Sequence, residues 1–568
     1  MYDLVIRNGC VIDGSGDPSR VTDVAVQDGL IAEVGSGLGP ARREIDAAGR
    51  LVMPGWVDIH THYDGQAIWD TEMAPSSQHG VTTAVFGNCG VGFAPVRGDS
   101  TPYLINLMEG VEDIPGTVLD EGLDFNWESF PDYLDQLAAA DRTMDIGAQV
   151  PHAALRFYVM GERGADHAEQ PNADEIETMG RLLEEALDAG ALGFSTSRTV
   201  KHRAADGSAT PSLSAAEPEL HSLAHAMRRA GRGVLQVNSD FGPGEFEILR
   251  AAAEVSGRPL SVLLLQSDTT PELWRETLSQ IHEARHAGLE VTGQVGSRSI
   301  GMLMGLETSM HPFAIRAAWQ EVADLDPAER LVRLRNDQAL RQRLINEPPV
   351  RDDMIAQIIE SALSKTFRLA EPLDYEPEPN ASLVAQAAQR GMQPLALALE
   401  WMLEQDGKGM MLYPFENYSE GNFDVVREML LDKATVCGLS DGGAHVGLIC
   451  DASSPTTLLT HWGRDRQRGS GLPLELLVNK QTRATALTYG LSDRGLIAPG
   501  LRADLNIVDF DRLQVRLPEV VYDLPAGGRR ILQRAEGYDH TFVAGVETFS
   551  KGEPTGERPG RLIRSGAL

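Results

Sequence analysis

The sequence predicts an α/β protein: a (β/α)8 TIM-like barrel with a small composite β-sandwich domain formed by both chain termini. Apolar runs alternate with helical patterns through the middle of the chain, and eight of these runs are suitable strands. The two ends carry short strand patterns instead. At 568 residues, the chain also exceeds one compact core, so two or more domains are expected. An open doubly wound sheet is the alternative architecture.

The two ends of the chain show similar strand patterns. Residues 1–53 alternate apolar and polar positions with period two, and Asn-Gly, Asp-Gly and Ala-Gly pairs punctuate the runs. This pattern predicts a small antiparallel sheet. The runs ADLNIVDFDRLQVR and DHTFVAGVETFSKG repeat it near the other end. We therefore expect residues 1–53 and 491–568 to form one β-domain, split around a central domain.

Residues 54–490 are predicted to form the barrel. Helical stretches such as ADEIETMGRLLEEALDAG separate many of the strand candidates. Polar residues follow the strands, and catalytic groups of such barrels lie at the carboxyl ends of the strands. The eight strand candidates are residues 55–62, 82–90, 144–152, 191–197, 233–240, 260–268, 289–296 and 434–441.

The segment at about 300–430 is the least regular part of the barrel region. It holds a charged helical stretch, PAERLVRLRNDQALRQRLI, and a proline-rich turn region, LAEPLDYEPEPNA. We interpret it as an insertion between strands seven and eight. A lid and an oligomer contact are the two roles considered for it, so a homo-oligomer remains open.

Composition narrows the classes of partner. The formal net charge is −32, from 82 acidic and 50 basic residues, which argues against nucleic acid or an anionic membrane. No eighteen-residue apolar run or signal-peptide pattern occurs, so we expect a cytoplasmic protein that acts on a small molecule. The scattered cysteines predict reduced thiols rather than disulfides. They are Cys10, Cys89, Cys437 and Cys450.

Two histidines end the first barrel strand in GWVDIHTH. In extended chain His60 and His62 point to the same side, where two imidazoles can hold one metal ion. The alternative is that they are simply polar residues at a strand end. Asp441 ends the eighth strand and lies next to the first strand in a closed barrel, so it is a suitable third ligand and proton acceptor. Its alternative role is a turn aspartate before Gly442-Gly443.

Other polar residues lie near strand ends. His152 closes strand three and either polarises a substrate carbonyl or makes a structural hydrogen bond. Arg198 and Lys201 belong to a basic cluster after strand four, which either binds a substrate carboxylate or is a solvated loop. His445 is expected to orient Asp441. Histidines in helical stretches are expected to be surface or packing residues: His221, His225, His282 and His286.

The chain resembles the amidohydrolase superfamily and, within it, the N-acyl-D-amino-acid deacylases (D-aminoacylases). The motifs that carry this resemblance are LVMPGWVDIHTHYDGQ, GVTTAVFGNCGVGFAPV, GALGFSTS, LSDGGAH and RGLIAPGLRADLNIVD. The resemblance implies a metal-carrying barrel with a composite β-domain. It implies that His60, His62 and Asp441 bind metal, with Asp441 also moving the proton. Cys89 matches a cysteine that ligates metal and bridges when two metals are present.

The sequence departs from this family at strands five and six. The resemblance implies a histidine at each of these strand ends, but Asn238 and Gln266 occupy them here. Amides bind zinc less well than imidazole does. We therefore expect one Zn²⁺ per chain and place Asn238 and Gln266 among the substrate-binding residues. The resemblance also implies a lysine after strand six and a tyrosine after the GFST motif, and this sequence has neither residue at those places.

The expected function is metal-dependent hydrolysis of a C–N amide bond in a small N-acylated, amino-acid-like substrate. A metal-activated water attacks the carbonyl, and Asp441 transfers its proton to the leaving nitrogen. The alternatives are a hydrolase of a cyclic amide or of a non-amide bond, and a catalytically inactive binding homologue.

Overall fold

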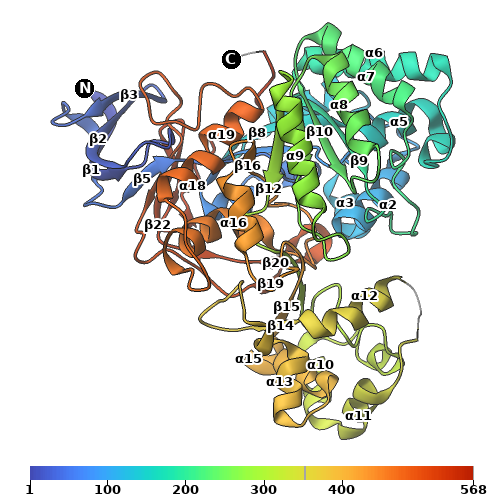
Figure 1. Ribbon diagram of the computed structural model, residues 1–568. Coiled ribbons are helices and arrows are strands. Elements are labelled where there is room, and N and C mark those ends of the chain that lie inside the picture. Colours follow the sequence, from blue (N-terminus) through green and yellow to red (C-terminus); the bar gives the residue numbers. More distant parts are fainter. Residues whose placement is uncertain (351–353, 567–568) are drawn as a thin grey trace.

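Eight parallel strands form the centre of the protein (Figure 1). The computed structural model describes residues 1–350 and 354–566. The strands lie in the order β16-β12-β11-β10-β9-β8-β7-β6, and each overlaps one predicted strand, so the eight predicted strands are confirmed. The bounds are β6 Trp56–Asp58, β7 Val81–Phe86, β8 Asp145–Pro151, β9 Gly193–Arg198, β10 Val234–Ser239, β11 Leu260–Leu263, β12 Val291–Val295 and β16 Thr435–Cys437.

The first and last barrel strands meet just beyond their carboxyl ends. Thr61 and Gly442 form a parallel bridge. Asp441 N donates to His60 O at 3.1 Å, and His62 N donates to Gly442 O at 2.8 Å. The sheet is thereby nearly closed into a barrel, which excludes the open doubly wound alternative.

Helices cover the outside of the barrel (Figure 1). In α6, the Asn172 side chain accepts a hydrogen bond from Glu175 N and Glu175 reciprocates, while Gly190 in the left-handed conformation ends the helix. The sequence NADEIETMGRLLEEALDAG therefore carries the signal that begins the helix and the signal that ends it. The main barrel helices are α4 Phe130–Ala139, α6 Ala173–Ala189, α7 Glu217–Ala230, α8 Glu245–Ser256, α9 Leu273–His286, α16 Asp424–Leu431, α18 Leu474–Gln481 and α19 Arg483–Thr488.

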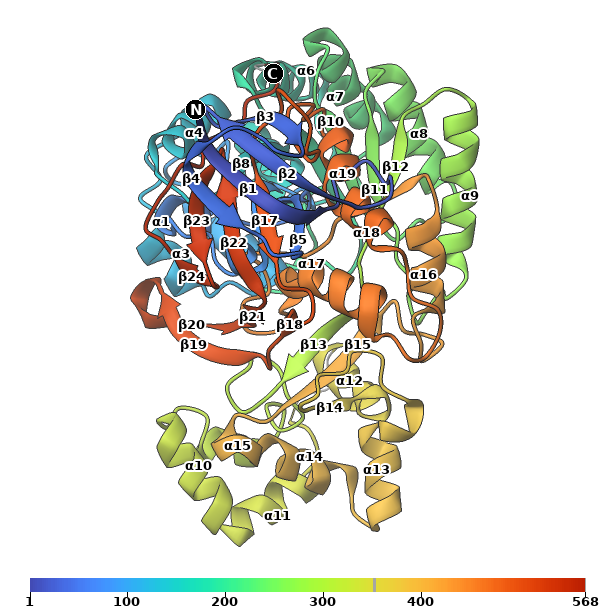
Figure 2. The same ribbon diagram turned by 90° about the vertical axis from the view of Figure 1, so that its left-hand side faces the viewer.

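Strands from both termini form one mixed sheet, as predicted (Figure 2). Two-stranded ribbons, β18 with β21 and β19 with β20, lie in the C-terminal part. The sheet strands are β1 Tyr2–Val11, β2 Arg20–Gln27, β3 Leu30–Gly35, β4 Ala41–Asp46, β5 Leu51–Pro54, β17 Leu505–Val508, β22 Tyr538–Val543, β23 Val546–Ser550 and β24 Glu553–Pro554; the ribbons are β18 Gln514–Val515, β19 Glu519–Leu524, β20 Gly528–Leu532 and β21 Ala535–Glu536.

The pairing in this sheet differs from the predicted antiparallel one. Strand β1 pairs in parallel with β4 and β5, because the chain crosses from β3 to the other side of β1. Strand β5 pairs with β17 in antiparallel register, with Leu51 opposite Val508. Apolar side chains such as Ile6, Val24 and Phe542 form a shared core. The termini are therefore joined by packing as well as by hydrogen bonds.

The predicted insertion is a small unit with its own apolar core beside the barrel (Figure 2). Residues 351–353 lie outside the described residues. Helix α16, in the last part of the predicted 300–430 segment, contacts β12 and β16 and so packs with the barrel. The elements are β13 Ile300–Met304, α10 Pro327–Asn336, α11 Gln338–Asn346, α12 Met354–Ala362, β14 Phe367–Leu369, α13 Leu383–Arg390, α14 Pro394–Met402, α15 Glu404–Gly407 and β15 Met410–Glu416.

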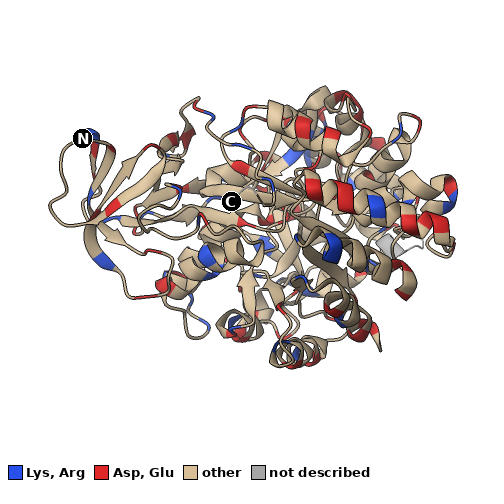
Figure 3. Ribbon diagram, turned by 90° about the horizontal axis from the view of Figure 1, so that it is seen from above, with Lys and Arg blue, Asp and Glu red and all other residues tan. Residues whose placement is uncertain are grey.

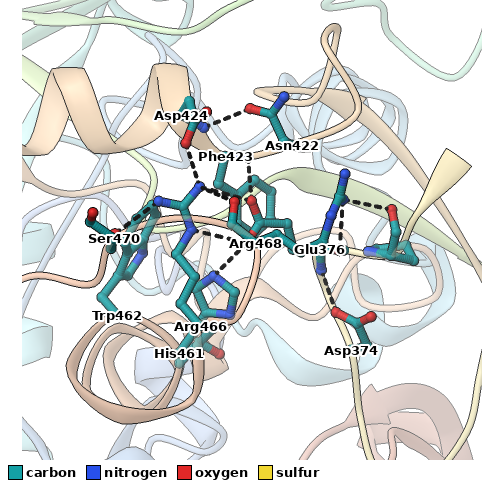
Figure 4. Close-up of polar contacts among 12 residues, drawn as sticks. Asp374, Glu376, Asn422, Phe423, Asp424, His461, Trp462, Arg466, Arg468 and Ser470 are labelled. Atoms are coloured by element: carbon teal, nitrogen blue, oxygen red, sulfur yellow. Dashed lines mark hydrogen bonds and ion pairs between the residues drawn. The ribbon is translucent and has the colours of Figure 1, made fainter.

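A buried ion cluster ties the insertion, through Glu376, to the chain that follows β16 (Figure 4). Both carboxylate oxygens of Glu376 lie 3.0 Å from guanidinium nitrogens of Arg466. Arg466 also bonds Asp424 at 2.7 Å, and His461 Nε2 lies 3.1 Å from Glu376. Burial alone raises the pKa of Glu376, but the hydrogen bonds from His461 and Arg466 outweigh it and lower the pKa to about 2.

Acidic side chains recur along the outer helices, in keeping with the net charge (Figure 3). Within residues 1–350 and 354–566, no helix has the length and apolar character needed to span a membrane.

Candidate metal centre

Two histidines and a cysteine meet at the carboxyl end of the barrel. His60 and His62 follow β6, and Cys89 follows β7. One ligand atom from each of the three residues lies within 4.8 Å of the others, and all three side chains are buried. The structure thus brings together three of the metal ligands that the sequence predicts.

The loop that carries Cys89 depends on two glycines. Gly87 and Gly90 both have positive φ, and a Cβ atom on Gly90 would lie 2.8 Å from Ser197 N. The loop therefore packs directly on β9. Cys89 N donates to Gln236 Oε1 at 2.9 Å, which fixes the cysteine over the barrel interior.

Asp441 reaches this group through the closure of the barrel. Its Oδ1 atom lies 3.5 Å from His60 Nε2 and 3.5 Å from His62 Nε2. The residue before it, Ser440, donates a hydrogen bond to Asp58. Asp58 is the last residue of β6, so this bond fixes the ends of strands one and eight to each other.

The donor atoms fit a zinc ion. The hydrogen bond of 2.8 Å from His60 Nδ1 to Gln294 Oε1 leaves Nε2 facing Cys89 Sγ at 3.3 Å. Edges of about 3.3–3.6 Å are expected in a tetrahedral site with Zn–N near 2.0–2.1 Å and Zn–S near 2.3 Å. Burial lowers the pKa of His60 to about 4 and of His62 to about 3, so both rings are in the neutral form that ligates metal.

Glu112 contacts the group from α2 (Thr101–Glu112), and the sequence did not reveal it. Its carboxylate lies 3.2 Å from His62 Nδ1 and 3.6 Å from His445 Nε2, and the side chain is buried. Carboxylates in this position fix the orientation of ligating histidines. Burial, followed by the charge of Asp441, raises the pKa of Glu112 well above its ordinary value. No pattern in the sequence distinguishes this glutamate from other helical acids.

His445 lies beside Asp441 but contacts Glu112 rather than the aspartate side chain. Its backbone N–H donates to Glu112 O, and its φ is 50°. Burial lowers its pKa to about 4. An orienting effect of His445 on Asp441 stays a prediction, whereas its contact with the carboxylate behind His62 is direct.

The two amides at strands five and six occupy different surroundings. Asn238 Nδ2 lies 3.6 Å from Cys89 Sγ and 3.3 Å from His202 Nε2. The Gln266 side chain instead accepts a hydrogen bond from Ser419 N at 3.2 Å. Asn238 is therefore in contact with the metal group, whereas the side-chain oxygen of Gln266 is bonded to the chain that follows β15.

The other predicted substrate residues are already engaged by protein partners. Both ring nitrogens of His152 have partners, Thr196 Oγ1 at 2.9 Å and Glu219 Oε1 at 3.0 Å. Arg198 pairs with Glu245. Lys201, which is 53% exposed, pairs with Glu416 at 2.5 Å. Substrate contacts by these residues stay predictions, and Lys201 is the most accessible of the three.

The insertion supplies charges at the carboxyl end of strand six. Glu416 ends β15, and Lys365 Nζ bonds both oxygens of Asp268 at 2.7 and 2.8 Å. Asn417 exchanges backbone and side-chain hydrogen bonds with Gln266 at 2.8 Å. The end of strand six is thus covered by the insertion, which sequence spacing did not predict.

Relatives of known activity share this architecture. The N-acyl-D-glutamate deacylase of Alcaligenes xylosoxydans xylosoxydans is 28% identical over 579 residues, covering 100% of this chain and 97% of that protein. A crystal structure of D-aminoacylase has a TM-score of 0.65 at 25% identity, covering 99% of this chain and 100% of that one. D-aminoacylase has also been described with a binuclear metal centre, one-metal activation and second-metal attenuation.

A further structure, N-acyl-D-glutamate deacylase from Bordetella bronchiseptica with zinc and a phosphonate inhibitor, has a TM-score of 0.65 at 23% identity and covers 99% of this chain and 100% of its own. At that identity the likeness is one of fold. The sequence profile of the amidohydrolase family matches residues 43–549, most of the chain. This protein therefore belongs to the amidohydrolase family.

Proposed function

We propose that the protein is a zinc-dependent hydrolase that cleaves the C–N amide bond of a small N-acylated, amino-acid-like substrate. The observation that carries the proposal is the convergence of His60, His62, Cys89 and Asp441 at the carboxyl end of the barrel. The full-length relationship to N-acyl-D-glutamate deacylase supports the substrate class.

The proposed roles follow from the positions of the side chains. His60, His62, Cys89 and Asp441 would hold one zinc ion, which supplies an acidified water and polarises the scissile carbonyl. The Asp441 carboxylate accepts the proton of the attacking water and delivers it to the leaving nitrogen. The C–N bond breaks and yields a carboxylate and an amine.

Two neighbours keep the histidines in place for this chemistry. Gln294 fixes the ring of His60 through Nδ1, and Glu112 contacts His62 through Nδ1. In both rings the Nε2 atom consequently faces Asp441. At the carboxyl end of the barrel, Lys201 is the proposed ligand of a substrate carboxylate, because its side chain is half exposed and can exchange Glu416 for a second acid.

A cyclic amide is the second candidate substrate. Asn238 stands where the family resemblance implies a ligating histidine, and the insertion covers the end of strand six. The change at Asn238 departs from the ligand set that the resemblance implies, which is why a substrate other than an acyclic N-acylated amino acid is the second candidate.

Metal analysis and a substrate screen test the proposal together. Protein purified without chelator should contain about one or more zinc ions per chain and release amine from N-acyl-D- or N-acyl-L-amino acids. A chelator should abolish this release and zinc should restore it. Turnover of cyclic amides alone would favour the second candidate. Less than about half a metal per chain, with no hydrolysis of either class, would overturn the proposal and favour an inactive binding homologue.

A further inference from the structure

His202 reaches the metal group through the side chain of Asn238, and no step of the proposed chemistry uses it. It follows β9, and its Nδ1 atom lies 2.9 Å from Ser197 Oγ. Its Nε2 atom lies 3.3 Å from Nδ2 of Asn238, which is paired in register with Ser197 on the neighbouring strand β10. The same Nδ2 atom lies 3.6 Å from Cys89 Sγ. Asn238 therefore lies between the histidine and the proposed zinc ligand.

The loop that carries His202 is fixed to the chain that follows β10. The Asp240 carboxylate accepts hydrogen bonds from Thr199 Oγ1 at 2.6 Å and from the next backbone N–H at 2.8 Å. On α2, Gly110 allows close packing of the same loop, since a Cβ atom there would lie 2.1 Å from the carbonyl carbon of Ala204. The ring of His202 is therefore held in place beside β10 rather than carried on a free loop.

The chemistry of the two neighbours decides which way the amide of Asn238 faces. A metal-bound cysteine is a thiolate, which accepts hydrogen bonds and donates none. An amide oxygen directed at Cys89 would place two electron-rich atoms against each other, so the NH₂ group faces the sulfur. The second hydrogen of this group then points at His202 Nε2, which accepts it when the proton of the ring is on Nδ1. Ser197 Oγ is the acceptor of that ring proton.

We propose that His202 and Asn238 are positioning residues for the Cys89 thiolate: His202 holds the amide, and the amide directs one N–H at the sulfur. The inference rests on the zinc position proposed above, because the sulfur is one of its ligands. Hydrogen bonds to a ligating sulfur reduce its charge and fix its direction, which tunes the bound metal. Strand five thus supplies a hydrogen bond to a ligand, whereas the family resemblance implies a histidine there that binds metal itself.

Exchange of zinc for Co²⁺ makes the sulfur visible, because a thiolate–cobalt bond gives a charge-transfer absorption band. Cys89→Ser identifies this band by removing it. A thiolate that loses a hydrogen bond holds its electrons less tightly, so the band should move to longer wavelength in Asn238→Ala and in His202→Leu. His202→Gln, whose side-chain oxygen can accept from the amide, should restore the wild-type position. His286→Leu is the matched control, because His286 is an exposed histidine on α9, and it should leave the band unchanged.

Zinc affinity gives a second readout. Competition with a chromophoric chelator should show a loss of about 10–100-fold in Asn238→Ala and in His202→Leu, the range that is typical when a partner of a metal ligand is removed. His202→Gln should bind zinc nearly as well as the wild type. A role of His202 in packing alone would lower the thermal midpoint and leave the position of the cobalt band unchanged.

Substitutions at both ends of the contact keep the test open if one variant does not fold. Asn238→Asp has nearly the same size as the wild type and lacks the donor, so it should shift the band in the same direction as Asn238→Ala. Ser197→Ala removes the partner of His202 Nδ1 and should give a smaller shift in that direction.

The position of the band in the variants decides the inference. An unchanged band in the Asn238 variants would overturn it, and a shift in those variants without one in His202→Leu or Ser197→Ala would overturn the part assigned to His202. Retained hydrolysis with an unchanged band would leave the proposed function intact. Absence of a thiolate–cobalt band in the wild type would overturn the inference together with Cys89 as a ligand, whereas zinc content and the substrate screen decide the proposed function.

Discussion

Two buried groups of ionisable side chains differ in how their charges are balanced. In the cluster around Glu376, the carboxylate meets Arg466 and His461, and its pKa falls to about 2 (Figure 4). At the barrel mouth, Glu112 lies between His62 and His445, and its pKa rises well above the ordinary value. One group is balanced by the protein's own cations, and the other, among the described residues, is not.

This difference separates a structural cluster from a functional one. A buried charge is costly unless it is paired, so a fold retains an unbalanced set of donors only where it serves another purpose. At the mouth, burial also lowers the pKa of His60 to about 4, so the histidines do not compensate for the acids as cations. The donor set there is suited to a divalent cation, whereas the Glu376 cluster needs none.

The largest expected effect is on turnover, and it follows from a change at Asp441 in the metal group. Asp441→Asn removes the proposed proton acceptor and one metal ligand, and we expect kcat/KM to fall by about 10²–10⁴-fold, up to about 5 kcal/mol in activation free energy. The thermal midpoint should change little. Initial-rate kinetics on the best substrate of the screen measures the effect. Full turnover by the variant would remove Asp441 from the mechanism.

The next largest effect is on the free energy of unfolding, and it follows from a change in the cluster around Glu376. Glu376→Gln leaves the buried Arg466 with only the exposed Asp424 as a charge partner, and removal of the buried partner of such a pair costs about 3 kcal/mol or more. We expect a clearly lower thermal midpoint, with turnover per folded molecule retained. Glu428→Gln is the matched control, because its pair with Arg275 is exposed and such pairs contribute at most about 1 kcal/mol. Equal midpoints for the two variants would contradict the comparison.

A smaller effect is expected on metal affinity. Glu112→Gln keeps the size of the side chain but weakens its hold on His62 Nδ1. Loss of such a partner typically lowers metal affinity by about 10–100-fold. Competition with a chromophoric chelator measures the change, and Glu109→Gln on the exposed part of α2 is the control. An unchanged zinc affinity would make Glu112 a packing residue.

The eight strands and three of the metal-group residues were predictable because local patterns encode them. Apolar runs with helical stretches between them predicted the strands, and HTH, NCG and SDGGAH each stand at a strand end. Barrel topology then requires that residues at the ends of strands one, two and eight meet. His60, His62 and Asp441 follow from these two steps without any knowledge of the loops, whereas a metal role for Cys89 was predicted only through the family resemblance.

Glu112, His202 and Gln294 were not predictable in the same way. Glu112 reaches His62 from a helix fifty positions along the chain, so the contact depends on how α2 packs on the loop after β9. The basic run RTVKHR was interpreted from its charge as a possible site for a substrate carboxylate. The residue of this run that contacts Asn238 is instead its histidine, His202. Gln294 is a polar residue inside a buried strand, which indicates that it has a hydrogen-bond partner. The sequence does not indicate that this partner is His60.

The smallest expected effect concerns acid and tests the cause assigned to the Glu376 cluster. The folded pKa of Glu376, about 2, is below the ordinary value of 4.5, so its contribution to stability is full above about pH 4.5 and is lost as pH falls toward 2. One proton changes the free energy of unfolding by at most about 1.4 kcal/mol per pH unit. The difference in stability between wild type and Glu376→Gln should therefore be constant from pH 7 to 5 and shrink below that. Denaturation midpoints at pH 7, 5, 4 and 3.5 measure it, and a difference that persists unchanged to pH 3.5 would mean that packing, not charge, makes Glu376 stabilising.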